Sequence, residues 1–341
     1  MALALEIRRH ASALYEVWKS LGIDNPKQYL NEFLSYSDYL TAMGLYASEV
    51  VDEIRGMASG SGLEFNEVYV LQLMDEEWAY RRQQLHARRA EKCSSAAIWD
   101  LERGVTFVGQ NMDLGVYTDG FQRLVHHAPG KGIPETMLFT LAGMVALMGT
   151  NSAGVGICVN ALPQLPSANV GVPVAVVIRL LLCTSSASEA VEVLHSIPHA
   201  TGQHYLIADP EGLHSYEASP AGVYEYRSPW PDRTFHTNHP LNSRLAAATG
   251  WSSAKNSQMR LKSMVSRLSG SPGSMADIAA ALSARDDPQD PVCRPRIDSN
   301  GPTSAMTCGS FISALHRGGA VHGVSTFGPP SELDYREWRL V

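Results

Sequence analysis

The sequence predicts an α+β protein in which helices are layered on β-sheets. Three observations support this class. In the first 90 residues, apolar residues recur almost throughout at helical spacing. After residue 93 the pattern changes to short β-like runs separated by glycine and proline turns. Pairs of helical segments interrupt those runs, and no linker or repeat divides the chain.

The N-terminal part is predicted to be almost entirely helical. Asp24-Asn25-Pro26 separates the first two helices, and Gly60-Ser61-Gly62 gives the third a C-terminal glycine stop. The pair Glu76-Glu77 suggests a carboxylate site, but a solvated helix face is the interpretation we adopt. The four helices are expected over residues 3–21, 27–43, 46–57 and from 66 through 78.

The remainder is predicted as strands interrupted by helical insertions. Ser185-Ser186 can cap the helix that follows them, and residues 235–240 are expected in a loop. Predicted helices cover residues 172–182, 187–194, 256–268 and 275–284. Predicted strands cover residues 95–99, 105–108, 123–127, 136–141, 149–160, 204–208, 214–217, 222–226, 304–312 and 320–325.

Composition bounds the class of protein. The 341 residues can form one large domain or two small ones, and 18% charged with 45% hydrophobic residues is typical of a soluble enzyme. A net charge of −7 argues against a general affinity for nucleic acid or anionic membranes. Charged residues interrupt the N-terminal apolar residues, whereas a signal peptide needs an uninterrupted apolar run. No apolar run in the sequence is long enough to span a membrane. We therefore expect a cytoplasmic protein.

Neither the cysteines nor the histidines form a recognisable metal motif. The cysteines are odd in number and lack a C-x-x-C pair, so most are expected to be buried reduced thiols. Among the histidines, His126 and His127 would point to opposite faces of a strand, and His236 with His239 could give at most two ligands. We expect no metal and no bound cofactor. The cysteines are Cys93, Cys158, Cys183, Cys293 and Cys308.

Cys93 is the candidate nucleophile. A G-x-S-x-G turn and the papain-type cysteine signature are both absent from the sequence. Our hypothesis is that the chain is cut between Lys92 and Cys93, which would give Cys93 a free α-amine beside its thiol. Such an amine has an ordinary pKa of ~7.7–8.0, so part of it is neutral at pH 7 and can accept the thiol proton.

Five segments resemble, in the same order and with similar gaps, the acyl-coenzyme A:6-aminopenicillanic acid acyltransferase (isopenicillin-N N-acyltransferase-like) family of N-terminal nucleophile (Ntn) hydrolases. That family is related to choloylglycine hydrolases and penicillin V acylases. The segments are Glu91-Lys92-Cys93-Ser94-Ser95 at the family's processing site, Gly109-Gln110-Asn111-Met112-Asp113, the glycine-rich stretch from Leu141 to Leu162, His236-Thr237-Asn238-His239-Pro240, and Pro291-Val292-Cys293-Arg294.

The resemblance implies a role for each matched residue. Cys93 would be the nucleophile, and Asp113 would accept a hydrogen bond from its α-ammonium or thiol. Asn238 would donate a hydrogen bond from its side-chain amide to the oxyanion, and Asn160 would donate a second one from its backbone N–H. Arg294 would be an active-site arginine. Simpler interpretations remain open, with Asn238 as a turn former, Asp113 as a strand-end cap and Arg294 in a surface ion pair.

The sequence also departs from the family pattern at three positions. Lys92 stands where the family usually has glycine, which lacks a Cβ and favours close approach of the backbone, so slower self-cleavage is expected. Ser94 replaces threonine and keeps its hydroxyl. Leu114 replaces a common tryptophan, which implies a different lining of the substrate pocket.

Taken together, the resemblance implies a four-layer αββα Ntn-hydrolase fold. Residues 1–92 would become a small chain that stays bound, and residues 93–341 the catalytic chain of this zymogen. The expected reaction is cleavage of a linear amide through an acyl-Cys93 intermediate, with transfer to water or an amine. The alternatives are an N-acyltransferase with an acyl-CoA thioester as co-substrate, or an unprocessed ligand-binding pseudoenzyme. A small-molecule amide or acyl donor is the expected partner, and homo-oligomers are compatible with the sequence.

Overall fold

The computed structural model describes residues 2–85, 92–128, 130, 132–249, 255–297 and 301–340. Of the predicted processing segment, Glu91 lies outside the described residues, whereas the backbone of Lys92 begins the first strand. Across the described ranges, none of the helices has the length and apolarity that crossing a bilayer requires. The predicted division of the chain into residues 1–92 and 93–341 stays a prediction, because it depends on whether the bond after Lys92 is cut.

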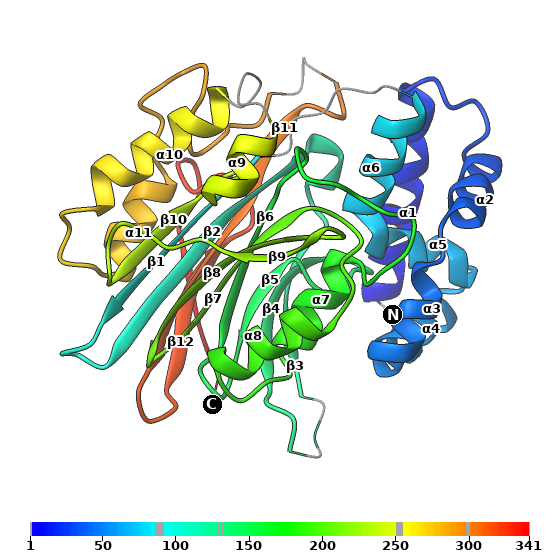
Figure 1. Cartoon of the computed structure of the whole chain (residues 1–341). Helices are drawn as coiled ribbons and strands as arrows, with labels where there is room; N and C mark the ends of the chain where they lie inside the picture. Colours follow the sequence, from blue (N-terminus) through cyan, green and yellow to red (C-terminus); the bar gives the residue numbers. More distant parts are fainter. Residues whose placement is uncertain are drawn as a thin grey trace.

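Two antiparallel sheets form the centre of the molecule (Figure 1). The first has the strand order β10-β1-β2-β11-β12-β13, and the second runs in sequence order from β3 to β9. In the first sheet the bounds are β1 Lys92–Asp100, β2 Val105–Gly115, β10 Arg233–His236, β11 Ala305–His316, β12 Val321–Thr326 and β13 Arg336–Leu340. In the second they are β3 Gln122–His127, β4 Thr136–Leu141, β5 Met148–Asn151, β6 Gly156–Ala161, β7 Gln203–Asp209, β8 Gly212–Ser219 and β9 Gly222–Glu225.

The sheets stack face to face, and helices cover their outer faces (Figure 1). On the first sheet, α10 and α11 pack over β1, β2, β10 and β11, and on the second, α8 packs over β7 and β8 beside α7. The predicted four-layer αββα fold is confirmed. The bounds are α7 Val174–Leu181, α8 Ala187–Ser196, α9 Ser243–Thr249, α10 Lys255–Leu268 and α11 Met275–Leu282.

The N-terminal helices gather at one end of the sandwich (Figure 1). They share one apolar core with the second sheet, to which Trp18, Phe33 and Ile54 contribute fully buried side chains. The predicted second and fourth helices each consist of shorter pieces, and Gly62 supplies the expected left-handed stop with φ of 72°. The bounds are α1 Ala2–Ser20, α2 Pro26–Tyr36, α3 Tyr39–Tyr46, α4 Ser48–Ser61, α5 Phe65–Tyr69, the 3-10 helix η1 Val70–Leu73 and α6 Met74–Leu85.

Several boundaries differ from the prediction. The glycine-rich stretch 149–160 is a pair of strands, β5 and β6, joined by a turn at Gly154, whose φ of 88° suits glycine. His236 ends β10, so the expected loop begins only at Thr237. Helix α9 and edge strand β13 were not predicted. Both are short, and exposed residues interrupt the apolar pattern of β13.

The solvated helix face expected for Glu76 and Glu77 is wrong, because both side chains are buried. Glu76 Oε1 accepts hydrogen bonds from the backbone N–H of Val174, at the start of α7, and from Thr201. Glu77 lies 2.6 Å from Arg81 and accepts a hydrogen bond from Tyr29. Charge pattern alone could not identify this packing, because Tyr29, Val174 and Thr201 are distant in sequence and only Arg81 lies on the same helix.

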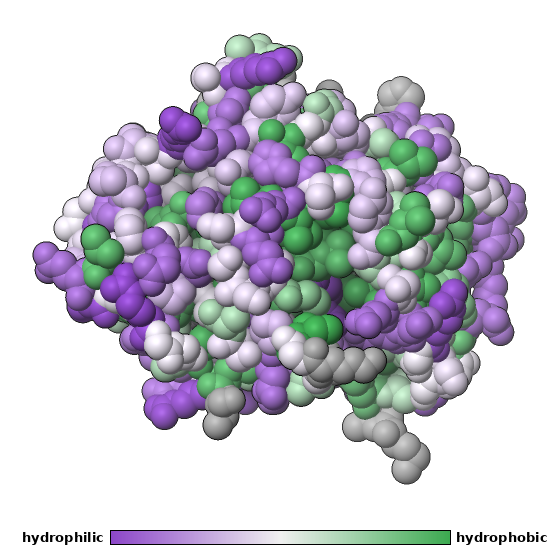
Figure 2. Space-filling view, turned by 60° about the horizontal axis from the view of Figure 1, so that its bottom comes forward, coloured by the Kyte–Doolittle hydropathy of each residue, from purple (hydrophilic) through white to green (hydrophobic). Residues whose placement is uncertain are grey.

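On the face that Figure 2 shows, hydrophilic side chains surround smaller groups of hydrophobic ones. Large apolar side chains that are exposed to solvent include Leu45, Leu101 and Leu333. Scattered exposed apolar residues are normal for a globular protein. Most of the remaining large apolar side chains lie in the core between the layers.

We expect Glu76→Gln to change how stability depends on pH. Burial, reinforced by the charge of Asp75, raises the pKa of Glu76 from 4.5 to about 8. Between these values the folded chain holds a proton that the unfolded chain releases, so wild-type stability falls as pH rises. The glutamine variant lacks this titration, so between these two values its stability relative to wild type should rise by up to ~1.4 kcal/mol per pH unit. Urea unfolding at about pH 5 and about pH 8 measures this. A difference that does not change with pH contradicts it.

A second prediction concerns Gly309 in β11, next to the bulge where the register with β2 shifts. A Cβ there would overlap the ring of Phe139 and lie 2.7 Å from the carbonyl oxygen of Thr326. We expect Gly309→Ala to lower the free energy of unfolding by about 1–3 kcal/mol. Gly212→Ala is the matched control, since nothing lies within 4 Å of its added Cβ. Equal unfolding midpoints in urea for the two variants would show the packing argument to be wrong.

Candidate active site

Cys93 lies at the start of β1, opposite Met112 of β2, and its Sγ is 3.6 Å from the Met112 sulfur. The side chain is 5% exposed. Burial, and then the charge of Asp113, raises the pKa of the Cys93 thiol to about 12. At neutral pH this thiol is therefore uncharged, and a nearby base must take its proton before it can act as a nucleophile.

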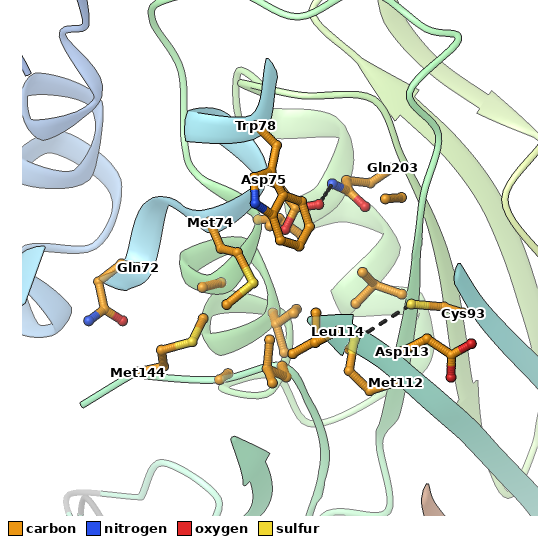
Figure 3. Close-up of a pocket in the computed structure, with 17 residues that line it drawn as sticks. Gln72, Met74, Asp75, Trp78, Cys93, Met112, Asp113, Leu114, Met144 and Gln203 are labelled. Carbon is orange, nitrogen blue, oxygen red and sulfur yellow. Dashed lines mark hydrogen bonds between the residues drawn. The ribbon is translucent and has the colours of Figure 1, made fainter. Parts of the chain in front are cut away.

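Cys93 forms part of the wall of a largely apolar cavity (Figure 3). Leu114, which stands where the family commonly has tryptophan, lines this cavity. Residues from both sides of the proposed cut contribute. From the N-terminal segment come Gln72, Met74, Asp75 and Trp78, and from the rest Cys93, Met112, Asp113, Leu114, Met144, Ala146, Leu147, Val159, Ala161, Val174, Ala175, Ile178 and Gln203.

Asp113 is buried on β2, where it pairs with Lys92, the residue before Cys93. Thr307 of β11 donates a hydrogen bond of 2.6 Å to its Oδ1. Arg294 Nε lies 4.0 Å from its Oδ2, so this arginine faces Asp113 as a charged neighbour. The register therefore places Asp113 opposite the residue before Cys93, and its expected hydrogen bond to the Cys93 amine or thiol stays a prediction. Thr307 was not identified from the sequence.

Asn238 lies in the loop after β10, against the backbone of Cys93. Its Oδ1 accepts a hydrogen bond of 2.7 Å from the Cys93 N–H, and its Nδ2 donates one of 3.0 Å to the carbonyl oxygen of Ala161. In the uncut chain both ends of the Asn238 amide are thus hydrogen-bonded, whereas its Nδ2 was expected to face an oxyanion. The loop itself is fixed by Ser257, which bonds the N–H of Asn238 at 2.7 Å.

Asn160 occupies β6, with its Oδ1 accepting hydrogen bonds from Ser95 at 2.7 Å and from His204 at 2.8 Å. The Val159 N–H donates a hydrogen bond to Gln110 Oε1, and the Val159 carbonyl oxygen accepts one from Gln110 Nε2. Because neighbouring residues of a strand point their backbone groups to opposite sides, the Asn160 N–H points toward β7. Among the described residues, its side-chain Nδ2 has no hydrogen-bond partner. The expected role of the Asn160 backbone N–H stays a prediction, and the side-chain Nδ2 is a further candidate donor.

Arg260 of α10 is the main site residue that was not identified from the sequence. It is 1% exposed and donates hydrogen bonds to the Cys93 carbonyl oxygen at 2.6 Å, to Ser94 Oγ at 3.0 Å and to Asn238 Oδ1 at 2.8 Å. Burial lowers its pKa to about 10, which leaves it a cation at neutral pH. A signal was present, because Arg260 shares the helical spacing of the apolar residues Met264 and Leu268 and so falls on the core-facing side.

The histidines of the His-Thr-Asn-His segment bond to protein groups. His236 Nε2 lies 2.9 Å from Glu217 Oε1, and its Nδ1 lies 2.7 Å from the carbonyl oxygen of Thr237. His239 Nδ1 lies 2.7 Å from Ser257 Oγ. Within the part of the chain that the structure describes, no three His, Cys, Asp or Glu side chains gather as metal ligands would.

Comparison with known proteins gives one family match. Residues 100–316 match the family model described as acyl-coenzyme A:6-aminopenicillanic acid acyl-transferase. A curated relative, the 40 kDa form of acyl-coenzyme A:6-aminopenicillanic-acid-acyltransferase from Emericella nidulans, is 27% identical over 245 residues. That alignment covers 71% of this chain and 66% of the relative, so just under two thirds of the relative's length is spanned.

Three solved structures are similar to this chain at low sequence identity. A mutant of conjugated bile acid hydrolase from Clostridium perfringens is 14% identical with a TM-score of 0.46, covering 73% of this chain and 92% of that one. A Caenorhabditis elegans ortholog of N-acylethanolamine-hydrolyzing acid amidase is 15% identical with a TM-score of 0.46, covering 73% and 100%. Penicillin V acylase from Agrobacterium tumefaciens is 15% identical with a TM-score of 0.41, covering 70% and 84%.

We predict that Arg260→Met destabilises the protein by about 3–5 kcal/mol, because it leaves several buried acceptors without their cationic donor. Arg267→Met is the matched control on the same helix, where an exposed arginine pairs with Asp286 at the surface. That change should stay within about 0.5 kcal/mol. Urea unfolding of both variants measures the difference. Similar losses in the two variants would show that the hydrogen bonds of Arg260 are not what stabilises this site.

Proposed function

This chain belongs to the acyl-coenzyme A:6-aminopenicillanic acid acyl-transferase family, and from that membership we propose that it is a self-processing cysteine amidohydrolase. In this proposal, cleavage before Cys93 yields an enzyme that opens a linear amide through an acyl-Cys93 intermediate. The acyl group then passes to water, or to an amine where one is bound. Residues 1–92 remain as a bound small chain.

One observation supports this proposal most directly. The backbone N–H of Cys93, which would become the α-amine, is held 2.7 Å from Asn238 Oδ1, while the thiol of the same residue forms part of the cavity wall. Asp113 lies opposite the residue before it. The proposed nucleophile and the nitrogen that can become its base thus belong to one residue, and a carboxylate lies on the neighbouring strand, which supports the proposal.

The proposed self-cleavage is an acyl shift from nitrogen to sulfur. Cys93 Sγ attacks the carbonyl carbon of Lys92, the bond from that carbon to the Cys93 nitrogen breaks, and the thiol proton ends on the departing nitrogen. Water then hydrolyses the Lys92 thioester, which restores the thiol and leaves a carboxylate on Lys92. The hydrogen bond from Arg260 to the Cys93 carbonyl oxygen holds the residue after the cut in place.

In turnover, the new α-amine takes the proton that burial holds on the Cys93 thiol. The thiolate attacks the substrate carbonyl, and the α-ammonium returns the proton to the leaving amine. Asn160 Nδ2, which is buried and has no partner among the described residues, is a donor suited to the oxyanion. Asn238 becomes a second donor if its amide is released from Ala161. Arg294 faces Asp113 and balances its charge.

The small chain has a physical reason to remain bound. Its helices share an apolar core with the second sheet, and its Gln72 side chain bonds the backbone of Gly143 and Val145 across the proposed cut. Breaking one peptide bond removes none of these contacts. Because Met74 and Trp78 also line the cavity, the small chain would remain part of the substrate site.

Intact-mass analysis of purified protein tests the processing step. Two polypeptides that meet at Lys92/Cys93 are expected, and Cys93→Ala should remain a single chain because it lacks the attacking thiol. Cys183→Ala, which removes an exposed cysteine, is the control and should be cut as in wild type. Cutting of Cys93→Ala at the same bond would refute the nucleophile assignment.

A panel of acyl donors and amine acceptors, read by mass spectrometry, tests the reaction itself. An acyl adduct on Cys93 followed by free acid supports hydrolysis, and a new amide supports acyl transfer. Wild-type protein that stays uncut and forms no adduct with any donor would instead support the ligand-binding alternative.

A further inference from the structure

Thr307 of β11 connects two of the five segments that resemble the family. It is fully buried, and its backbone N–H donates a hydrogen bond of 3.0 Å to the carbonyl oxygen of Arg294. Its Oγ1 accepts one of 2.8 Å from the Arg294 N–H, and its hydroxyl donates one of 2.6 Å to Asp113 Oδ1. One neutral side chain thus links the end of segment 291–294 to the carboxylate of Asp113.

The chemistry of these groups fixes the direction of the hydrogen bond to Asp113. A hydroxyl has one proton to donate, and the Arg294 N–H can only donate, so it occupies a lone pair of Thr307 Oγ1 and leaves that proton for Asp113. The distance of 2.6 Å is typical of a hydroxyl that donates to an ionised carboxylate. The Cys293 thiol also lies near this hydroxyl, but its sulfur is a weaker acceptor. The Thr307 hydroxyl therefore favours the ionised form of Asp113.

A β-bulge brings this hydroxyl to Asp113. Gly309 of β11 pairs with Met112, but the register then shifts, so that Thr307 pairs with Asp113 and Cys308 is left between them. Residues directly opposite each other on antiparallel strands point to the same face of a sheet. Without the shift, Cys308 would stand opposite Asp113, and Thr307 would point to the other face. Bulges beside active sites commonly redirect a side chain in this way.

Asp113 and the candidate nucleophile lie at the same end of the cavity (Figure 3). Burial is the main cause that raises the pKa of the Cys93 thiol, and the charge of Asp113 is the next. Arg294 Nε lies 4.0 Å from Asp113 Oδ2. Replacing the neutral Thr307 hydroxyl therefore changes a hydrogen bond of Asp113 without adding or removing a charge. Other described groups whose charge interacts with that of Asp113 include Arg260, Cys293 and Cys308.

From these contacts we propose that Thr307 is a positioning residue, whose hydroxyl keeps the Asp113 carboxylate ionised and in one orientation at the Cys93 end of the cavity. The assignment rests on the proposed function, in which this carboxylate accepts a hydrogen bond from the Cys93 nitrogen as cleavage turns it into an amine. An acceptor whose orientation is fixed by a neighbour serves that amine better than a mobile one. The alternative is that Thr307 only holds segment 291–294, and with it the charge of Arg294, in place on β11.

Titration of Asp113 in the full-length Cys93→Ala protein tests the contact without requiring cleavage. NMR of isotope-labelled aspartate carboxyl carbons follows the titration, and the signal that an added Asp113→Asn change removes identifies the residue. We expect Thr307→Val, which keeps the shape and loses the hydroxyl, to raise the pH at which Asp113 becomes protonated by about one unit or more. Thr307→Ser, which keeps the hydroxyl, should leave that pH unchanged.

Two controls separate the hydroxyl from the alternative. Thr106→Val removes another buried hydroxyl of β2, one that donates to the carbonyl oxygen of Asp209, and should leave the Asp113 titration unchanged. In an Arg294→Met background, Thr307→Val should still raise the pH at which Asp113 becomes protonated, because the effect comes from the hydroxyl and not from the arginine charge. If Thr307→Val does not fold, the smaller Thr307→Ala replaces it, with Thr106→Ala as its control.

The rate of self-cleavage tests the role of the contact. Proteins that retain Cys93 are made by cell-free synthesis, and intact mass follows the uncut fraction over time after synthesis is stopped. We expect Thr307→Val to be cut at least about tenfold more slowly than wild type, because a hydrogen bond to a charged group is lost. Thr307→Ser and Thr106→Val should be cut at nearly the wild-type rate.

The outcomes are distinct. Asp113 that ionises identically with threonine and valine at position 307, or a shift that disappears in the Arg294→Met background, would overturn the positioning role. So would a loss in Thr307→Ser as large as that in Thr307→Val. Wild-type cleavage that does not depend on residue 307 would refute this inference and leave the proposed function standing. A shifted Asp113 titration in a protein whose wild type is never cut would refute the proposed function and retain the contact between Thr307 and Asp113.

Discussion

A single buried guanidinium connects the parts of the candidate site. Arg260 extends from α10 to the carbonyl oxygen of Cys93 on β1 and to the side chain of Asn238 in the loop after β10. A cation taken out of water must be matched by acceptors, so the packing of α10 on the first sheet and the closure of that loop stabilise each other. The position of the Cys93 backbone, and with it the orientation of the thiol, depends on this interaction.

The N-terminal segment is part of the fold and of the cavity at once. Its buried aromatic residues extend the apolar core of the second sheet, while Trp78 and Asp75 reach the cavity from α6. The buried carboxyl group of Glu76 accepts a hydrogen bond from the first turn of α7, whose residues also line the cavity. The shape of the cavity therefore depends on contacts between segments that a cut before Cys93 would place on different chains.

Local pattern predicted much of the fold but less of the site. The change from helical to strand spacing at Cys93, the cap at Ser186 and the glycine stop at Gly62 agree with the structure, because each depends on residues near in sequence. The solvated face expected at Glu76 was wrong, because its partners come from other elements. Edge strand β13 was not predicted, because an exposed edge strand needs little apolar alternation.

The sequence by itself determined the α+β class, the order of most helices and strands, and the five segments that mark the family. It could do so because spacing and caps are set by residues within a few positions of each other. Only the tertiary structure decided that the Asn238 oxygen faces the Cys93 N–H, that Asn160 has a spare side-chain donor, and that Arg260 lies beneath the nucleophile. Arg260 and Cys93 are 167 residues apart, and Thr307 and Asp113 are 194 apart. Hydrogen bonds over such separations depend on how the layers pack, which no local pattern records.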